Sequence, residues 1–159
     1  MTSAAIVSLR VAASPERAFD AFTRDIGAWW RADQFFALTP RGDGEMFFEP
    51  GPDGRLATRL ASGKIYEIGR ILKWAPPHLL AFQWRPATFA PEQMTEVEVR
   101  FEAVDNGARI TIEHRAWDAI AQSHVARHSF ELIAFQRRLA LFWRAGLSSM
   151  AEQISDGGR

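Results

Sequence analysis

Residues 79–117 constrain the fold of this chain most strongly, because they predict three consecutive strands that share one apolar face. In residues 95–102 charged side chains alternate with Thr, Val and Phe, which is the two-residue period of a half-buried strand. Asn106 and Gly107 form a strong hairpin-turn signal, and residues 109–114 repeat the alternation. The sequence therefore predicts an antiparallel sheet with one apolar face and one face in water.

A long amphipathic helix is predicted at residues 131–154. Phe135, Leu139 and Phe142 recur there at the three- and four-residue spacing of one helical face. Gly146 lies on the same face, where it either permits a close approach to the sheet or is a tolerated weakness of about 1 kcal/mol relative to Ala. The sheet and the helix can bury their apolar faces against each other, and a curved sheet would leave a hollow between them. We therefore expect an α+β fold with an internal, aromatic-lined cavity.

The rest of the chain contains shorter predicted elements. Ser14 and Pro15 predict the start of a short helix, since a serine side chain caps free backbone N–H groups and proline suits the first helical position. A second short helix is predicted at residues 25–30. Further strands are predicted at residues 5–12, 45–49, 56–60, 65–74 and 79–85. We expect one domain over residues 1–155 and a frayed tail at residues 156–159.

Charge and cysteine content exclude several classes of function. The 159 residues carry 19 basic and 19 acidic side chains, so no broad basic surface for nucleic acid is predicted. The chain contains no cysteine, which excludes disulfides, thiolate metal sites and cysteine nucleophiles. The N-terminus has no signal-peptide pattern, and no stretch is apolar for long enough to span a membrane. We expect a cytoplasmic protein without integral membrane association.

Several strings of residues resemble one known superfamily. Residues 13–22 read ASPERAFDAF, which resembles the opening motif of the SRPBCC (START-like) superfamily. The pair Trp29-Trp30, PPHLLAFQW at residues 76–84 and GARITIEH at residues 107–114 resemble the branch named after the activator of heat-shock protein 90 ATPase. The resemblance covers nearly the whole chain. It implies the helix-grip fold, a curved antiparallel sheet wrapped around a long C-terminal helix with two short helices after the first strand.

A ligand cavity between the sheet and the C-terminal helix is the site that we expect. Its lining would be the side chains that the strand and helix periodicities turn inward, with Tyr66 and His114 orienting a ligand. The expected lining residues are Trp30, Phe47, Tyr66, Phe82, Trp84, Val99, Phe101, His114, Phe135, Leu139 and Phe142. Core packing is the alternative role for these rings. For the adjacent pair Trp29 and Trp30, the alternative is one ring in the core and one at the surface.

The histidines are the candidate residues for acid-base chemistry and for metal binding. His114 is expected on the inward side of its strand, where it could orient a ligand or act as a general base, and a hydrogen-bonded structural histidine is the alternative. His124 and His128 have the i,i+4 spacing of two metal ligands on a helix. Val125 stands where the zinc-protease motif has glutamate, so we interpret the pair as solvated. We expect no metal and no cofactor.

The leading functional hypothesis is non-covalent binding of a hydrophobic or aromatic small molecule. It leads because no catalytic motif stands out, so an enzyme is the less favoured interpretation. One alternative is a cyclase, dehydratase or hydrolase of aromatic or polyketide-like substrates, with His114 as a weak candidate acid-base residue. The other is a co-chaperone-like domain with a chaperone partner, which the resemblance implies. A homodimer is also considered.

Overall fold

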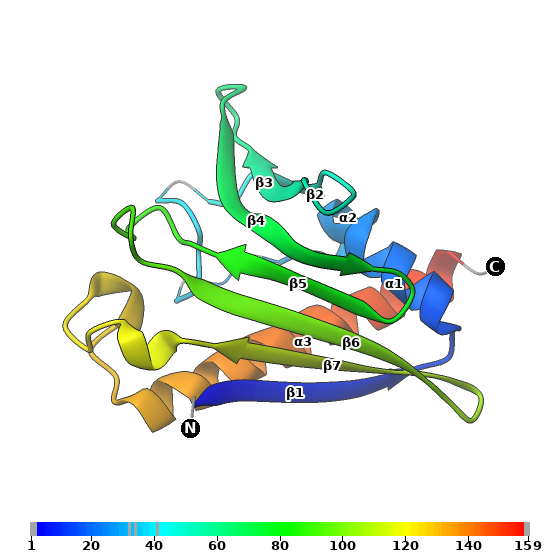
Figure 1. The fold of residues 1–159 in the computed structure, drawn as a ribbon. Helices are drawn as coiled ribbons and strands as arrows, with labels where there is room; N and C mark the ends of the chain where they lie inside the picture. The colour runs from blue at the N-terminus through cyan, green and yellow to red at the C-terminus, as the bar shows by residue number, and fades with distance from the viewer. Residues whose placement is uncertain (1–2, 32, 34, 41, 158–159) are drawn as a thin grey trace.

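The computed structural model describes residues 3–31, 33, 35–40 and 42–157 and shows a curved sheet with helices on one side (Figure 1). The strands are β1 (Ala4–Val11), β2 (Glu45–Phe48), β3 (Arg55–Arg59), β4 (Ile65–Ala75), β5 (Leu79–Trp84), β6 (Thr95–Val104) and β7 (Gly107–Arg115). The helices are α1 (Pro15–Thr23), α2 (Ile26–Trp29) and α3 (Leu132–Gly157), with two 3₁₀ turns, η1 (Trp117–Ala119) and η2 (Val125–Arg127).

The strands form one antiparallel sheet in the order β1-β7-β6-β5-β4-β3-β2. β1 pairs along its whole length with β7, so that Ala4 lies opposite Arg115 and Val11 lies opposite Ala108. α3 runs across one face of the sheet, behind it in the view of Figure 1, and α1 and α2 pack beside α3. This arrangement confirms the predicted α+β helix-grip fold.

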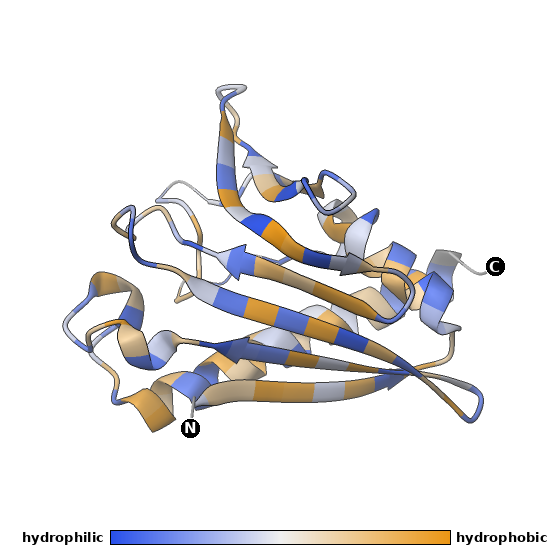
Figure 2. Cartoon of the chain, viewed as in Figure 1, coloured by the Kyte–Doolittle hydropathy of each residue, from blue (hydrophilic) through white to orange (hydrophobic). Residues whose placement is uncertain are grey.

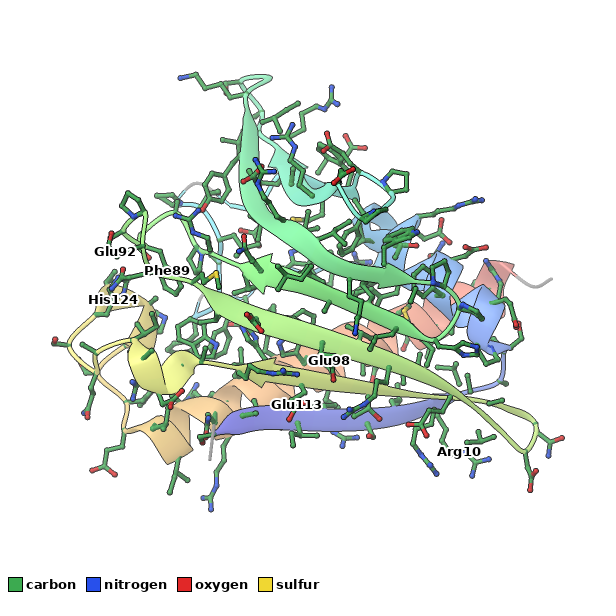
Figure 3. All side chains as sticks on the ribbon, viewed as in Figure 1. Arg10, Phe89, Glu92, Glu98, Glu113 and His124 are labelled. Carbon is green, nitrogen blue, oxygen red and sulfur yellow. The ribbon has the colours of Figure 1, made fainter. Side chains whose placement is uncertain are left out.

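The alternation that predicted the sheet is visible along β6 and β7 (Figure 2). On the inner face, Val99 and Phe101 are at most 1% exposed. On the outer face, the cross-strand partners Glu98 and Glu113 project away from the core (Figure 3). Arg115 offsets the repulsion between these two carboxylates, since its Nη2 lies 3.0 Å from an oxygen of Glu113 and 3.4 Å from an oxygen of Glu98.

α1 begins where the sequence predicts. The Ser14 side chain accepts a hydrogen bond from the backbone N–H of Arg17 at 3.1 Å, and a proline occupies the first turn. Phe19 and Phe22 face the sheet, with ring centroids 5.1 and 6.0 Å from that of Phe101. The short helix therefore adds aromatic rings to the core.

α3 differs from its prediction at the C-terminal end. It extends through Asp156 and Gly157, which were expected in a frayed tail, whereas residues 158–159 lie outside the described residues. At Gly146 an added Cβ atom would lie 3.4 Å from Cζ3 of Trp29, which is an ordinary contact. This glycine is therefore a tolerated weakness and no close approach requires it. Within the described part of the chain, no helix is long and apolar enough to cross a membrane.

Candidate functional site

A cluster of indole rings surrounds His114 inside the molecule. His114 lies on β7 and is fully buried. The Nε1–H of Trp143, on α3, points at His114 Nδ1 from 3.0 Å, and the Nε1–H of Trp117, on η1, points at His114 Nε2 from 3.0 Å. The hydroxyl oxygen of Thr95 lies 2.8 Å from the same Nε2. Three elements thus converge on one imidazole.

The hydrogen-bond partners of His114 decide which of its two neutral tautomers is favoured. A neutral imidazole carries one N–H and one lone pair, so it cannot accept from both indoles. With the proton on Nε2, His114 donates to the Thr95 hydroxyl, which donates in turn to the Trp84 carbonyl at 2.9 Å, and Nδ1 accepts from Trp143. The other tautomer would leave two donors without an acceptor, the Nδ1–H of His114 and the N–H of Trp143. The Nε2–H form is therefore favoured, and it leaves the Trp117 N–H without an acceptor.

The protonation of His114 follows from this environment. Burial lowers its pKa from 6.5 to about 3, because the charged form would lose its hydration. A second ring proton would also face the indole N–H of Trp143. His114 therefore stays neutral near pH 7, out of contact with solvent, which is the geometry of a hydrogen-bonded structural histidine.

The space between sheet and helices is occupied by the rings that were expected to line a hollow. Phe82, Phe101 and Phe135 are at most 1% exposed. The Phe82 ring packs 5.3 Å from the ring of Phe48 and 6.5 Å from that of Phe22, centroid to centroid. The expected lining residues buried in this common core are Trp30, Phe82, Trp84, Val99, Phe101, His114, Phe135, Leu139 and Phe142.

Of the two remaining residues of the expected lining, Phe47 lies outside the core and Tyr66 packs against its edge. The prediction that Phe47 faces inward is wrong, because its neighbours Met46 and Phe48 pack on the core and strand alternation turns Phe47 to the other face. The Arg59 guanidinium lies over the Phe47 ring at 5.8 Å. Tyr66 is half-buried, and its hydroxyl donates to the Arg85 carbonyl. Burial raises the Tyr66 pKa, so this hydroxyl remains a donor near pH 7.

Both adjacent tryptophans lie in the core, so the alternative of one core ring and one surface ring is wrong. Trp29 is fully buried and Trp30 is 8% exposed. The Trp29 indole donates to the Ala21 carbonyl at 2.9 Å, and the Trp30 indole donates to the Asp43 carboxylate at 3.1 Å. α2 ends at Trp29, so the helical geometry that would separate the two rings does not extend to Trp30.

A pocket of about 100 Å³ with an aromatic lining lies next to the C-terminal end of β5. We use "aromatic pocket" for this hollow, whose lining comes from the segment before β2, the last residue of β5 and the segment after it, and the segment between β7 and α3. The lining residues are Phe35, Phe36, Ala37, Trp84, Pro86, Thr88, Trp117, Val125, Ala126 and His128. Among the lining residues expected from the sequence, Trp84 is the one that reaches it.

The segment between β7 and α3 closes this pocket and is held by its own contacts. Arg127 is buried and donates to the carbonyls of Ile120 and Phe130 at 2.7 and 2.8 Å. His128 hydrogen-bonds to the Phe35 carbonyl, which ties the segment to the opposite wall. Figure 3 shows Phe89 beside His124, and their ring centroids lie 5.4 Å apart.

Sequence reasoning missed this segment as part of a site. His124 and His128 are not on one helical face, because η2 separates them and His128 has a left-handed backbone with φ of 50°. The His124 ring caps the turn by accepting from the Ala126 N–H at 3.1 Å. The available signal was Trp117 itself, a large aromatic residue just beyond the last predicted strand.

A second hollow of about 510 Å³ lies between α3 and the segment before β2. We call it the helix groove. Its lining residues are Arg31, Asp33, Phe35, Phe36, Arg138, Leu141, Phe142, Ala145 and Gly146. Phe35 and Phe36 line both hollows, so they form the wall that separates the helix groove from the aromatic pocket.

Comparison with known families and sequences gives one match. The family model described as Activator of Hsp90 ATPase homolog 1-like protein matches residues 12–140. A search of curated proteins found no match. The matched range begins before α1 and ends within α3, so it spans most of the sheet and both walls of the aromatic pocket.

Solved structures share the fold of this chain. A protein from Mesorhizobium loti is 16% identical over 99% of each chain, with a TM-score of 0.65. The Aha1 dimer from Colwellia psychrerythraea is 17% identical over 96% of each chain, with a TM-score of 0.63. CalC, a self-sacrificing resistance protein from Micromonospora echinospora, is 22% identical over 97% of this chain and 95% of its own, with a TM-score of 0.62.

Proposed function

Because the chain belongs to the family of Activator of Hsp90 ATPase homolog 1-like proteins, we propose that it binds a hydrophobic or aromatic small molecule in the aromatic pocket. The wider superfamily that the sequence resembles includes binders of lipids and hormones. The observation that carries the proposal is the pocket itself, where Trp84 and Trp117 meet Phe35 and Phe36 around an open space. Concave sites lined by aromatic rings with a few polar groups are the usual form of small-molecule sites.

The volume of the aromatic pocket limits the size of the group that it can enclose. An apolar cavity of roughly 150 Å³ accepts benzene, so a pocket of about 100 Å³ takes at most one ring. The remainder of a larger ligand would lie outside, next to Thr88 and His128 at the rim. Aromatic side chains in the lining offer a ring contact area and allow edge-to-face or offset stacking.

Filling the aromatic pocket tests this proposal. N-phenylnaphthylamine is a neutral fluorescent probe with one phenyl ring of suitable size, and we expect the wild-type chain to bind it saturably. In Ala126→Phe the new ring would occupy the pocket, because Ala126 lines it, so binding should fall about tenfold or more. Ala121→Phe is the matched control, since Ala121 is exposed in the same segment and does not line the pocket. Equal affinity in all three proteins would refute the proposal.

The enzymatic alternative finds little support in the geometry of His114. The imidazole is enclosed by indoles and stays neutral near pH 7, and it is not among the residues that line the aromatic pocket or the helix groove. A chaperone partner is the second candidate, and the family description favours it. Stimulation of an Hsp90 ATPase by the purified chain would support that role, and an unchanged rate would count against it.

A further inference from the structure

The helix groove differs from the aromatic pocket in its charge. Arg31 and Arg138 line it together with one carboxylate, that of Asp33. One oxygen of this carboxylate accepts a hydrogen bond from the Phe35 N–H at 2.7 Å, which partly satisfies its negative charge. Among the described residues that line the groove, the ionisable side chains therefore sum to one positive charge.

Arg138 is held in a fixed position within the groove. Its guanidinium carbon lies 4.6 Å from the ring centroid of Phe35 and 5.0 Å from that of Phe130. Two aromatic faces thus hold the planar group, which restricts its rotamers before any ligand arrives. No ion pair formed by the described residues includes Arg138.

Arg31 is also anchored by its backbone neighbours. Its Nη1 donates to the carbonyls of Ala28 and Trp30 at 3.1 and 2.9 Å, at the end of α2. Those bonds use the hydrogens of one guanidinium nitrogen and leave Nε–H and Nη2–H available. Like Arg138, Arg31 takes part in none of the ion pairs among the described residues.

The remaining wall of the groove is apolar. Leu141 is 66% exposed although it is a large hydrophobic residue, and Phe36, Phe142 and Ala145 line the same hollow. A volume of about 510 Å³ lies within the roughly 300–1,000 Å³ range of small-molecule sites. Cations beside an exposed apolar wall match a molecule that carries both a negative group and a hydrophobic body.

We propose that the helix groove is a second binding site, selective for an amphipathic organic anion such as an aromatic sulfonate or carboxylate. Arg138 and Arg31 bind the anionic group through charge-assisted hydrogen bonds, and the wall around Leu141 and Phe142 takes the apolar body. The site lies on the other side of Phe35 and Phe36 from the aromatic pocket and does not depend on a ligand there.

A pair of fluorescent probes of similar shape tests the proposal. Anilinonaphthalene sulfonate carries a negative charge, whereas N-phenylnaphthylamine is its neutral counterpart. In Arg138→Gln we expect the affinity for the sulfonate to fall about tenfold, as for loss of a charge-assisted hydrogen bond, and the affinity for the neutral probe to stay the same. Arg144→Gln is the control, because Arg144 is an exposed arginine on the same helix that does not line the groove.

A second variant distinguishes loss of the binding site from a change in folding. Arg138→Gln also removes contacts to Phe35 and Phe130, whereas Leu141→Glu alters an exposed side chain and adds a negative charge inside the groove. Leu141→Glu should weaken binding of the sulfonate at least as much. Unchanged sulfonate affinity in Leu141→Glu and in folded Arg138→Gln would overturn the second site. Loss of neutral-probe binding in Ala126→Phe concerns the aromatic pocket alone, so the two proposals fail separately.

Discussion

At the scale of single residues, the buried neutral His114 makes stability depend on pH. Above about pH 7 the ring is neutral in both the folded and the unfolded chain. Below pH 6.5 the unfolded ring gains a proton while the buried ring, with a pKa of about 3, does not. The free energy of unfolding should therefore fall by about 1.4 kcal/mol per pH unit between about pH 6 and pH 4 from this group.

Urea unfolding of the wild type and of His114→Gln across this range measures that contribution. Carboxylates titrate in both proteins, so the informative quantity is the difference between the two stability profiles. We expect the wild type to lose its advantage as the pH falls, while the variant lacks the histidine slope. Parallel profiles would show that the folded state takes up a proton at His114 as easily as the unfolded state does.

The two indoles around His114 should contribute unequally. Both are 2% exposed, so replacement by phenylalanine removes a similar amount of buried surface. Trp143 donates to the lone pair of the favoured tautomer, whereas the Trp117 N–H has no acceptor in that tautomer. Trp143→Phe should therefore destabilise the fold by about 1–2 kcal/mol more than Trp117→Phe. Chemical denaturation compares the two variants, and the reverse order would contradict the assigned tautomer.

Strand alternation predicts that His114 points inward, but it does not predict which side chains hydrogen-bond to the ring. The partner Trp143 lies 29 positions further along the chain, on another element. The same alternation was misapplied at Phe47, because a strand of four residues contains too few positions to decide which face is inward. Inward and outward assignments were reliable on the longer strands β6 and β7.

At the scale of elements, two glycines should respond to alanine in opposite ways. A Cβ atom at Gly69 in β4 would lie 1.9 Å from the Gln83 carbonyl oxygen in β5, so Gly69→Ala must displace backbone and should cost roughly 3 kcal/mol. Gly146→Ala meets only an ordinary contact in α3 and should stabilise the fold by up to about 1 kcal/mol. Thermal unfolding distinguishes them, and destabilisation by Gly146→Ala would show that α3 needs this glycine.

Helices and strands with a regular apolar pattern could be placed from the sequence, and segments without one could not. β6, β7 and α3 carry long, regular apolar patterns, and the sequence places them within a few residues. The segment from Ala116 to Phe130 carries no such pattern. Its course depends on left-handed residues such as Ala116 and on hydrogen bonds from Arg127 to backbone carbonyls, which sequence spacing does not reveal. The wall of the aromatic pocket was therefore the part that sequence reasoning missed.

At the scale of the whole molecule, side chains pack the interior where the sequence predicted a cavity, and the site that we propose is instead the aromatic pocket next to the C-terminal end of β5. Periodicity identifies inward side chains, but whether they fill space or enclose it depends on the summed volumes of several elements. Here α1 contributes Phe19 and Phe22 and α3 contributes Trp143, and these rings pack the interior against Phe101 and Trp84. The open space remains where irregular segments meet.

A two-dimensional NMR titration with N-phenylnaphthylamine, followed at the tryptophan indole N–H signals, tests whether the aromatic pocket binds a ring. The chain has six tryptophans, so each serves as a separate reporter. We predict that the Trp84 and Trp117 signals shift to saturation because these rings line the aromatic pocket, while the Trp29 signal, from an indole bonded to Ala21 in the core, stays in place. Saturating probe that leaves Trp84 and Trp117 unmoved would contradict ligand binding in this pocket.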